Sequence, residues 1–203
     1  MTSFIVQHPL FRSFSELTQT HRPLDLILAD HYRHQLLAQE LVDLSESLDQ
    51  EDVCEDAHLI HTYLISGLTE HEAFEEHDLV PILKRRCKHS DNADNLLAIL
   101  IWDHFVDKDN VEVVNLSLAR LARGEKLRDV EGFQANVRRF AARMKQHTLW
   151  ENKVIVPLAR KRLSPVDLAE LGERAADRRR QSLWPSLHSD MADGLFRANS
   201  RTH

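Results

Sequence analysis

A motif of histidine and glutamate occurs twice in this chain with the same internal spacing. His71-x3-Glu75 and His147-x3-Glu151 begin 76 residues apart, and a proline follows each glutamate after six residues. Either copy alone would be a weak signal, because about one His-x3-Glu pair is expected by chance in a chain with 13 histidines. The repetition is informative, since it predicts two matching segments that carry metal-ligand side chains.

An Asp-His pair precedes each copy of the motif. Asp30-His31 places its histidine 40 residues ahead of the first motif, and Asp103-His104 places its histidine 43 residues ahead of the second. Residues four apart project from one face of an α-helix on successive turns, so a helical His-x3-Glu offers an imidazole and a carboxylate side by side. The repeated order, a single histidine and then His-x3-Glu, predicts a duplicated metal site.

The composition favours helices and a single core. The chain has five Gly and six Pro, which are few for a β-rich protein with many turns. With 42% apolar residues in 203, it can bury one core and is short for two independent domains. We therefore expect one all-α domain.

Apolar residues recur every three or four positions along four long stretches. This periodicity predicts four helices, at about 23–48, 54–86, 91–124 and 129–163. Ser90-Asp91 and Asp129 are the expected N-caps of the third and fourth helices. Four such helices predict an antiparallel up-down four-helix bundle over residues 23–163.

Segments outside the bundle are also expected. Ser164-Pro165 is typical of a helix start and predicts a short fifth helix at 164–181. Residues 1–22 carry several large apolar side chains and are expected to form an N-terminal arm against the bundle. Residues 182–203 form a polar tail for which the sequence predicts no structure.

The candidate ligands replace apolar residues on the helix stripes that are predicted to face the core. Burying this much polarity would be very costly without a metal, and two helices with His-x3-Glu plus two with a single His supply donors for a dinuclear centre. The candidates are His31, His71, Glu75, His104, His147 and Glu151. Neighbouring side chains that could support them or complete the coordination, with ordinary surface contacts as the alternative, are Asp30, His34, Glu76, Asp103 and Asp107.

Charge and hydropathy argue against two classes of function. The net charge of -6 disfavours binding to the phosphate backbone of nucleic acids. The longest apolar run, at 96–102, is far too short to span a bilayer, and the N-terminus lacks a basic region followed by an apolar stretch. Two cysteines without CxxC spacing fit a reducing compartment, so we expect a cytoplasmic protein without nucleic-acid or membrane partners.

At these residues the chain resembles the hemerythrin-like, or HHE cation-binding, family. The resemblance covers about residues 23–163 and rests on the two Asp-His pairs and the segments HEAFEEHDLVPIL and HTLWENKVIVPLA. It implies a non-haem di-iron site with an oxo or hydroxo bridge. The four histidines would be terminal ligands, and Glu75 and Glu151 would be bridging carboxylates.

The chain departs from the oxygen-carrying members of this family. They have a second histidine four residues after the helix-three histidine, where this chain has Lys108, and His-x4-Asp in helix four, where it has Asn152. The pattern is closer to the bacterial hemerythrin-like proteins and to di-iron proteins of nitric oxide response and iron-centre repair.

The resemblance implies that the site binds a small molecule, namely O2, NO or peroxide. Four His and two bridging Glu supply about eight of the roughly twelve bonds of two six-coordinate irons, and an oxo bridge supplies about two more, so about two positions stay open. One interpretation is an oxidoreductase that consumes peroxide or NO. Such an enzyme could receive electrons from a redox partner. The alternatives are a non-enzymatic O2 or iron sensor or carrier, and a zinc-bound structural bundle.

Overall fold

The computed structural model describes residues 22–181, and within this range every regular element is helical. The α-helices are α3 (Pro23–Glu46), α4 (Val53–Tyr63), α5 (Thr69–Phe74), α6 (Val80–Arg86), α7 (Ala93–Leu121), α8 (Val130–Lys153), α9 (Ile155–Arg162) and α10 (Pro165–Gln181). The expected tail and all but the last residue of the expected N-terminal arm lie outside the described residues.

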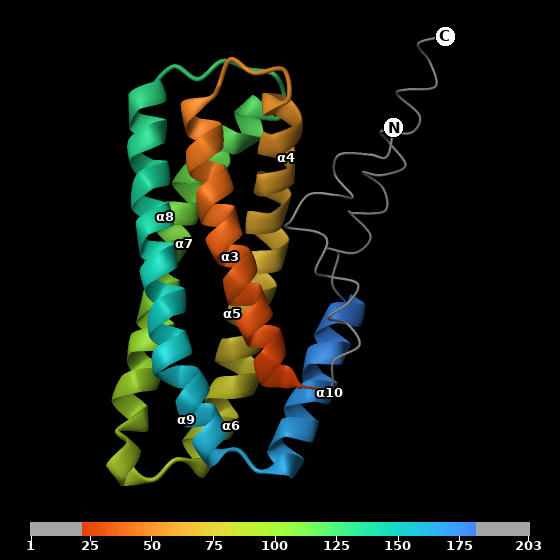
Figure 1. Ribbon diagram of the computed structural model, residues 1–203, viewed down its shortest axis with the longest axis vertical. Helices are drawn as coiled ribbons and strands as arrows, with labels where there is room; N and C mark the ends of the chain where they lie inside the picture. The colour runs from red at the N-terminus through yellow and green to blue at the C-terminus, as the bar shows by residue number, and fades with distance from the viewer. Residues whose placement is uncertain (1–21, 182–203) are drawn as a thin grey trace.

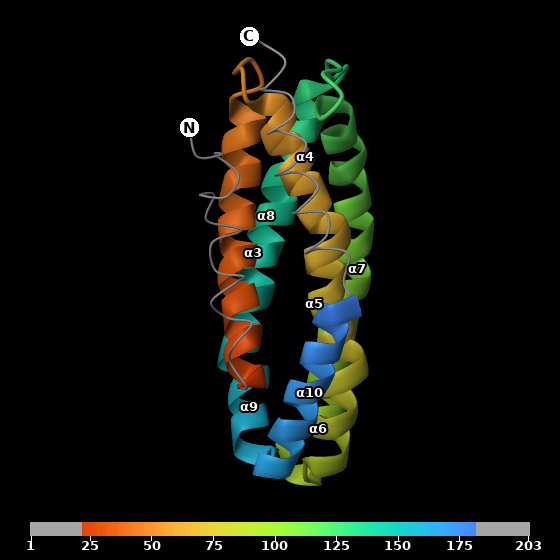
Figure 2. The same ribbon diagram turned by 90° about the vertical axis from the view of Figure 1, so that its right-hand side faces the viewer.

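The helices form four long antiparallel rods with a fifth helix on one side (Figure 1). The first rod is α3, the second runs from α4 through α6, the third is α7, and the fourth joins α8 to α9. Successive rods run in opposite directions, and α10 lies against α3 and α5 near one end of the bundle (Figure 2). This confirms the predicted all-α, up-down four-helix bundle with a short fifth helix.

The apolar core is divided by a layer of buried polar residues. One cluster of buried apolar side chains includes Leu37, Leu68 and Phe140, and the other includes Ile27 and Ile155. Along each rod, the candidate histidine lies between the residues of one cluster and those of the other. The bundle therefore holds the polar layer between two dry segments of core.

The second rod changes its helical geometry on both sides of His71. Leu64–Leu68 and Glu75–Leu79 are π-helical, so the hydrogen-bond ladder is wider before and after the ligand-bearing turn. Single π-helical turns within α-helices occur frequently at functional sites. In the fourth rod the equivalent position is a break, where Val154 has φ -120° between α8 and α9. The π-helical segment Glu75–Leu79 lies just ahead of Pro81, and the break at Val154 lies just ahead of Pro157. Proline has no N–H to donate to the helical hydrogen-bond ladder.

The two predicted caps have different outcomes. Asp129 caps α8 as expected, because its Oδ1 accepts a hydrogen bond of 2.8 Å from the Gly132 N–H. The prediction for Ser90-Asp91 is wrong, since the N-cap of α7 is Asn92, at φ 53°. The carboxylate of Asp91 instead accepts from the Lys88 N–H and from Arg162. Arg162 lies far away in sequence, so this pairing has no local signature.

A reciprocal cap and an ion pair fix the start of α10. The Ser164 N–H donates to Asp167 at 2.8 Å, and the Asp167 N–H donates to the Ser164 hydroxyl at 3.2 Å. Arg86, at the end of α6, donates to the same carboxylate at 2.9 and 3.0 Å. Hydrogen bonds from Arg86 and Ser164 hold the pKa of Asp167 well below its usual range.

We expect Asp167→Asn to lower the melting temperature at neutral pH. A carboxyl whose pKa is depressed in the folded state stabilises the protein above its unfolded pKa, about 4, and this contribution is lost as the pH falls further. The difference in melting temperature between wild type and variant should therefore narrow below about pH 4. Thermal unfolding at a series of pH values would measure this difference. Asp177→Asn, at an exposed i,i+3 pair with Arg180, is the matched control with little effect. A gap that stays constant down to pH 2 would contradict the electrostatic origin.

No helix within residues 22–181 is long and apolar enough to cross a membrane.

Candidate metal centre

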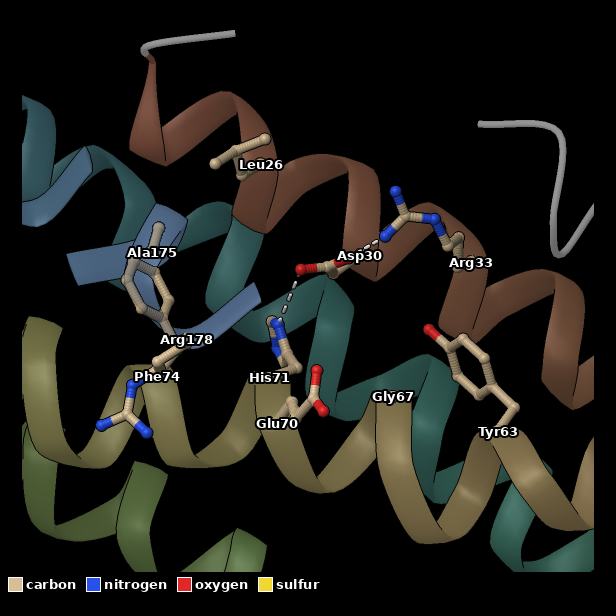
Figure 3. Close-up of a pocket in the computed structure, with 10 residues that line it drawn as sticks. All are labelled: Leu26, Asp30, Arg33, Tyr63, Gly67, Glu70, His71, Phe74, Ala175 and Arg178. Atoms are coloured by element: carbon tan, nitrogen blue, oxygen red, sulfur yellow. Dashed lines mark hydrogen bonds and ion pairs between the residues drawn. The ribbon is translucent and has the colours of Figure 1, made fainter. Parts of the chain in front are cut away.

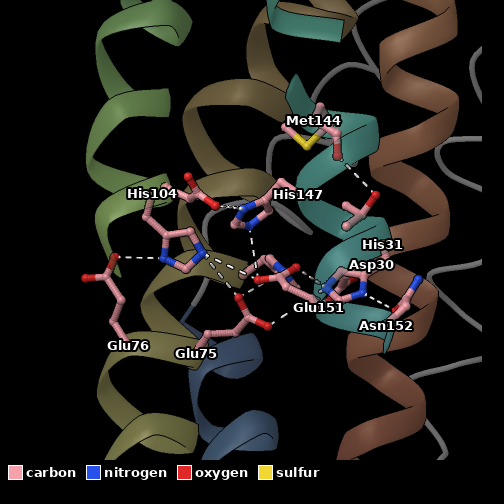
Figure 4. Close-up of polar contacts among 12 residues, drawn as sticks. Asp30, His31, Glu75, Glu76, His104, Met144, His147, Glu151 and Asn152 are labelled. Carbon is pink, nitrogen blue, oxygen red and sulfur yellow. Dashed lines mark hydrogen bonds and ion pairs between the residues drawn. The ribbon is translucent and has the colours of Figure 1, made fainter. Parts of the chain in front are cut away.

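Four histidines and two glutamates meet in the polar layer of the bundle. Figure 4 labels His31, Glu75, His104, His147 and Glu151 among them. Each rod contributes one imidazole, and the second and fourth rods also contribute the carboxylates. All six side chains are buried, and both glutamates are fully inaccessible to solvent. The six residues are His31, His71, Glu75, His104, His147 and Glu151.

The Nε2 atoms of the imidazoles point toward the carboxylates. Glu151 lies 2.9 Å from His31 and 3.0 Å from His147, measured from carboxylate oxygen to Nε2. Glu75 lies 3.4 Å from both His71 and His104. Each carboxylate therefore lies close to one imidazole from each sequence repeat, where a repeat is an Asp-His pair and the His-x3-Glu motif that follows it.

These atoms form two groups that could each hold a metal ion. The first contains His31, His71, Glu75 and Glu151, and the second contains His104, His147 and Glu151. Within each group the potential ligand atoms lie within 4.8 Å of one another. Glu151 belongs to both groups, so its carboxylate lies between the two positions.

The donor set fits metal ions better than it fits a network of hydrogen bonds. Both oxygens of Glu75 and of Glu151 are buried and make no well-formed hydrogen bond, and the polar atoms closest to them are the Nε2 atoms of the four imidazoles. Buried carboxylates that are not paired or coordinated are very costly. Imidazole nitrogen and carboxylate oxygen together suit iron and zinc, so cations at this position would satisfy these atoms.

In the metal-free protein, protons take the place of the cations. Burial favours neutral imidazoles, but contacts with Glu151 and Glu75 outweigh it and raise the pKa of His31 to about 10 and of His104 to about 11. Burial itself prevails at His71 and lowers its pKa to about 4. A metal must displace the protons on His31 and His104, so metal uptake should release protons and tighten as the pH rises.

The outward-facing Nδ1 atoms have partners in a matching pattern. Asp30 approaches the Nδ1 of His71 at 3.6 Å, and Asp103 approaches that of His147 at 3.7 Å. Each aspartate precedes the single histidine of its own repeat but contacts the histidine of the His-x3-Glu motif. These contacts place two of the predicted supporting residues directly behind candidate ligands.

The single histidines are held by residues from the opposite repeat. Glu76 accepts from the Nδ1 of His104 at 2.9 Å, and Asn152 Oδ1 accepts from the Nδ1 of His31 at 2.6 Å. Sequence reasoning proposed Glu76 but did not propose Asn152 as a site residue. Its signal was available, because Asn152 follows Glu151 just as Glu76 follows Glu75.

His34 and Asp107 occupy equivalent positions, each three residues after a single histidine, but they have different surroundings. His34 is buried and its ring packs edge-on against His71, with the centroids 4.6 Å apart, and against Tyr63 at 6.1 Å. Burial lowers the pKa of His34 well below its usual value, so the ring is neutral. Asp107 accepts a hydrogen bond of 2.7 Å from Arg143. Neither residue belongs to the two donor groups.

A small pocket adjoins the centre on the side of α10 (Figure 3). Its volume is about 50 Å³, and His71 and Asp30 form part of its wall. The other lining residues are Leu26, Arg33, Tyr63, Gly67, Glu70, Phe74, Ala175 and Arg178. A cavity needs about 10–15 Å³ of this kind of volume to hold one water molecule, so the pocket has room for a few water-sized molecules.

The fold and the site agree with a comparison against protein families. The family described as Hemerythrin HHE cation binding domain matches residues 22–159. The chain therefore belongs to the hemerythrin HHE cation-binding family. A search of curated proteins found no match.

We expect Asn152→Ala to weaken metal binding by about 10–100-fold, the usual effect of removing a hydrogen-bond partner behind a ligating imidazole. The variant frees the ring of His31 and leaves all six candidate ligands in place. Competition with a chelator would measure the affinity. Asn110→Ala is a matched control, because Asn110 bonds only to the backbone oxygen of Val106 among the contacts described for residues 22–181. Equal affinities in both variants would contradict a supporting role for Asn152.

Proposed function

We propose that this chain is a non-haem di-iron protein that binds O2, NO or peroxide. In this proposal His31 and His71 bind one iron, His104 and His147 bind the other, and Glu75 and Glu151 bridge them. The observation that carries the proposal is the position of Glu151, which is shared by both donor groups. A mononuclear site would not need a carboxylate aligned with imidazoles on both sides.

A count of coordination positions supports a small exogenous ligand. Four imidazoles, two bridging carboxylates and an oxo or hydroxo bridge supply about ten of roughly twelve bonds, which leaves about two positions for an exogenous ligand. A bound redox-active metal pair would supply electrons and open positions for reaction with O2, NO or peroxide. A pocket of about 50 Å³ lies beside His71 and Asp30.

The protein side chains would bind, orient and shield the centre. Glu76 and Asn152 hold His104 and His31 by hydrogen bonds to Nδ1, which directs their Nε2 atoms inward. Asp30 and Asp103 lie 3.6 and 3.7 Å from the Nδ1 atoms of His71 and His147. The apolar clusters on either side exclude bulk water from the polar layer. Asp30 also lines the pocket beside His71.

A sensor or carrier is the second candidate function, and the contacts of α10 favour it. Asp78, three residues after Glu75, pairs with Arg174 at 3.3 Å and also with Arg178 on α10. A change in the position of Glu75 on metal or ligand binding would therefore reach a peripheral helix that a partner protein can contact. Such a protein would bind its ligand without consuming it.

Metal content per chain and a visible absorption spectrum test the proposal. The reduced protein is measured before and after exposure to air, peroxide and NO. Two irons per chain and an oxo-bridge charge-transfer band are expected. Zinc as the bound metal, or a folded protein that takes up no metal, would overturn the proposal.

Turnover separates the two candidate functions. Consumption of peroxide or NO by many equivalents per chain, in the presence of a reductant, indicates an enzyme, whereas binding of one equivalent without consumption indicates a sensor or carrier. Asp78→Asn is the informative variant. It should leave consumption unchanged in an enzyme, but in a sensor it should uncouple α10 from the site, which proteolysis of α10 would report.

A further inference from the structure

The two repeats differ at one of the four contacts to the outward-facing imidazole nitrogens. Asp30 and Asp103 are both carboxylates at similar distances from their histidines. Behind the single histidines, however, His104 has the carboxylate of Glu76, whereas His31 has the neutral amide of Asn152. The two imidazoles thus donate to acceptors that differ by one full charge.

Other nearby charges add to this difference. On the His31 side, the buried guanidinium of Arg33 pairs with Asp30. On the His104 side, Arg143 is shared between two carboxylates, at 2.7 Å from Asp107 and 3.6 Å from Asp103. This side therefore carries more uncompensated negative charge.

The cation nearest to Glu76 offsets only part of its charge. Lys108 Nζ lies 3.8 Å from Glu76 Oε1, but the Lys108 side chain is 58% exposed, whereas that of Glu76 is 20% exposed. Water and salt screen an exposed ammonium more strongly than a half-buried carboxylate. The net effect on His104 remains negative.

A carboxylate that accepts from the Nδ1–H of a ligating imidazole makes the imidazole a stronger donor. A stronger donor, together with nearby negative charge, stabilises the more positive oxidation state of the metal. We propose that the two metals are electronically unequal, and that the metal at His104 and His147 is oxidised at a lower potential than the metal at His31 and His71. Glu76 and Asn152 are the positioning residues that set this order.

This inference rests on the proposed di-iron function and adds an order of electron transfer to it. The first electron to leave the reduced pair would come from the metal on the Glu76 side. In the half-oxidised protein, the oxidised metal would then be mainly the one on the Glu76 side, rather than either metal with equal probability.

Redox titration of the iron-loaded protein tests the inference, with one electron passing from one metal to the electrode at each step. Glu76→Gln should raise the lower potential, and Asn152→Asp should lower the higher one, each by at least about a tenfold change in equilibrium constant, or ~59 mV. The double variant should narrow the gap between the two potentials by the sum of the two single shifts. Electron paramagnetic resonance of the half-oxidised forms would show a changed signature in the double variant.

A control variant isolates the role of the contact. Glu112→Gln removes a negative charge from α7, the helix of His104, at an exposed position. It should shift both potentials only slightly and change the gap between them far less than Glu76→Gln does. If it shifts the gap between the potentials as much as Glu76→Gln does, long-range charge explains the order and the assignment to Glu76 is overturned.

The outcomes distinguish this inference from the proposed function. Zinc-loaded protein, studied by nitrogen-15 nuclear magnetic resonance, should show protonated Nδ1 atoms at His31 and His104 without any redox chemistry. Two bound irons whose potentials do not respond to Glu76→Gln or Asn152→Asp would overturn the inference and leave the di-iron proposal intact. A protein that binds no iron would overturn both.

Discussion

The Glu151→Ala variant is expected to bind less than one metal ion per chain. Glu151 belongs to both donor groups, and its two oxygens lie 2.9 and 3.0 Å from imidazoles on opposite sides of the centre. Removing it takes a donor from both groups at once, so under the proposed di-iron function the loss of affinity should exceed the roughly 10–100-fold that follows loss of an outer contact. Metal analysis after dialysis would measure the remaining stoichiometry.

A histidine variant provides the comparison. His147 belongs to one donor group, so His147→Ala should reduce the content toward one metal per chain and leave the other position filled. Circular dichroism of both metal-free variants would show whether the bundle is intact. Two metals per chain in the Glu151→Ala protein would refute the shared carboxylate.

The Phe140→Ala variant is expected to lose about 3–5 kcal/mol of unfolding free energy, as large-to-small changes in a well-packed core do. Phe140 is fully buried in the apolar cluster that includes Leu37 and Leu68. The side chain makes no contact with the candidate ligands that is described among residues 22–181, so metal content should be unchanged while the protein is folded. Urea unfolding of the metal-free proteins would measure the free energy.

Leu149→Ala is the control for this variant. Leu149 lies on the same helix, α8, but is 50% exposed, so its truncation should change the stability by no more than about 0.5 kcal/mol. A loss below about 1 kcal/mol in Phe140→Ala would indicate that the surrounding helices collapse into the space.

Much of the architecture was predictable because helices are local structures. The predicted first helix, 23–48, corresponds to α3 at Pro23–Glu46, and the fifth helix begins at Pro165 as its cap predicted. Periodicity, caps and prolines act over a few residues, so their signals can be recognised in one sequence. The failed cap at Asp91 is instructive, since a distant arginine competes for that carboxylate.

The gathering of the six candidate ligands was also predictable. Histidine and glutamate on apolar stripes must be buried, and in a four-helix bundle the stripes face one another. The sequence alone therefore placed His31, His71, His104 and His147 in one layer, with both glutamates beside them.

The tertiary structure decided which residue supports which ligand. That Asp30 contacts His71, and that Asn152 holds His31, depends on the rotation and relative height of neighbouring helices. The π-helical segments around His71 alter this alignment. A shift of one residue moves a helical side chain by about 100° around the axis, and local patterns do not encode the register between helices. The sequence thus determined the fold and the donor set, while packing between helices determined the outer contacts that distinguish the two halves of the centre.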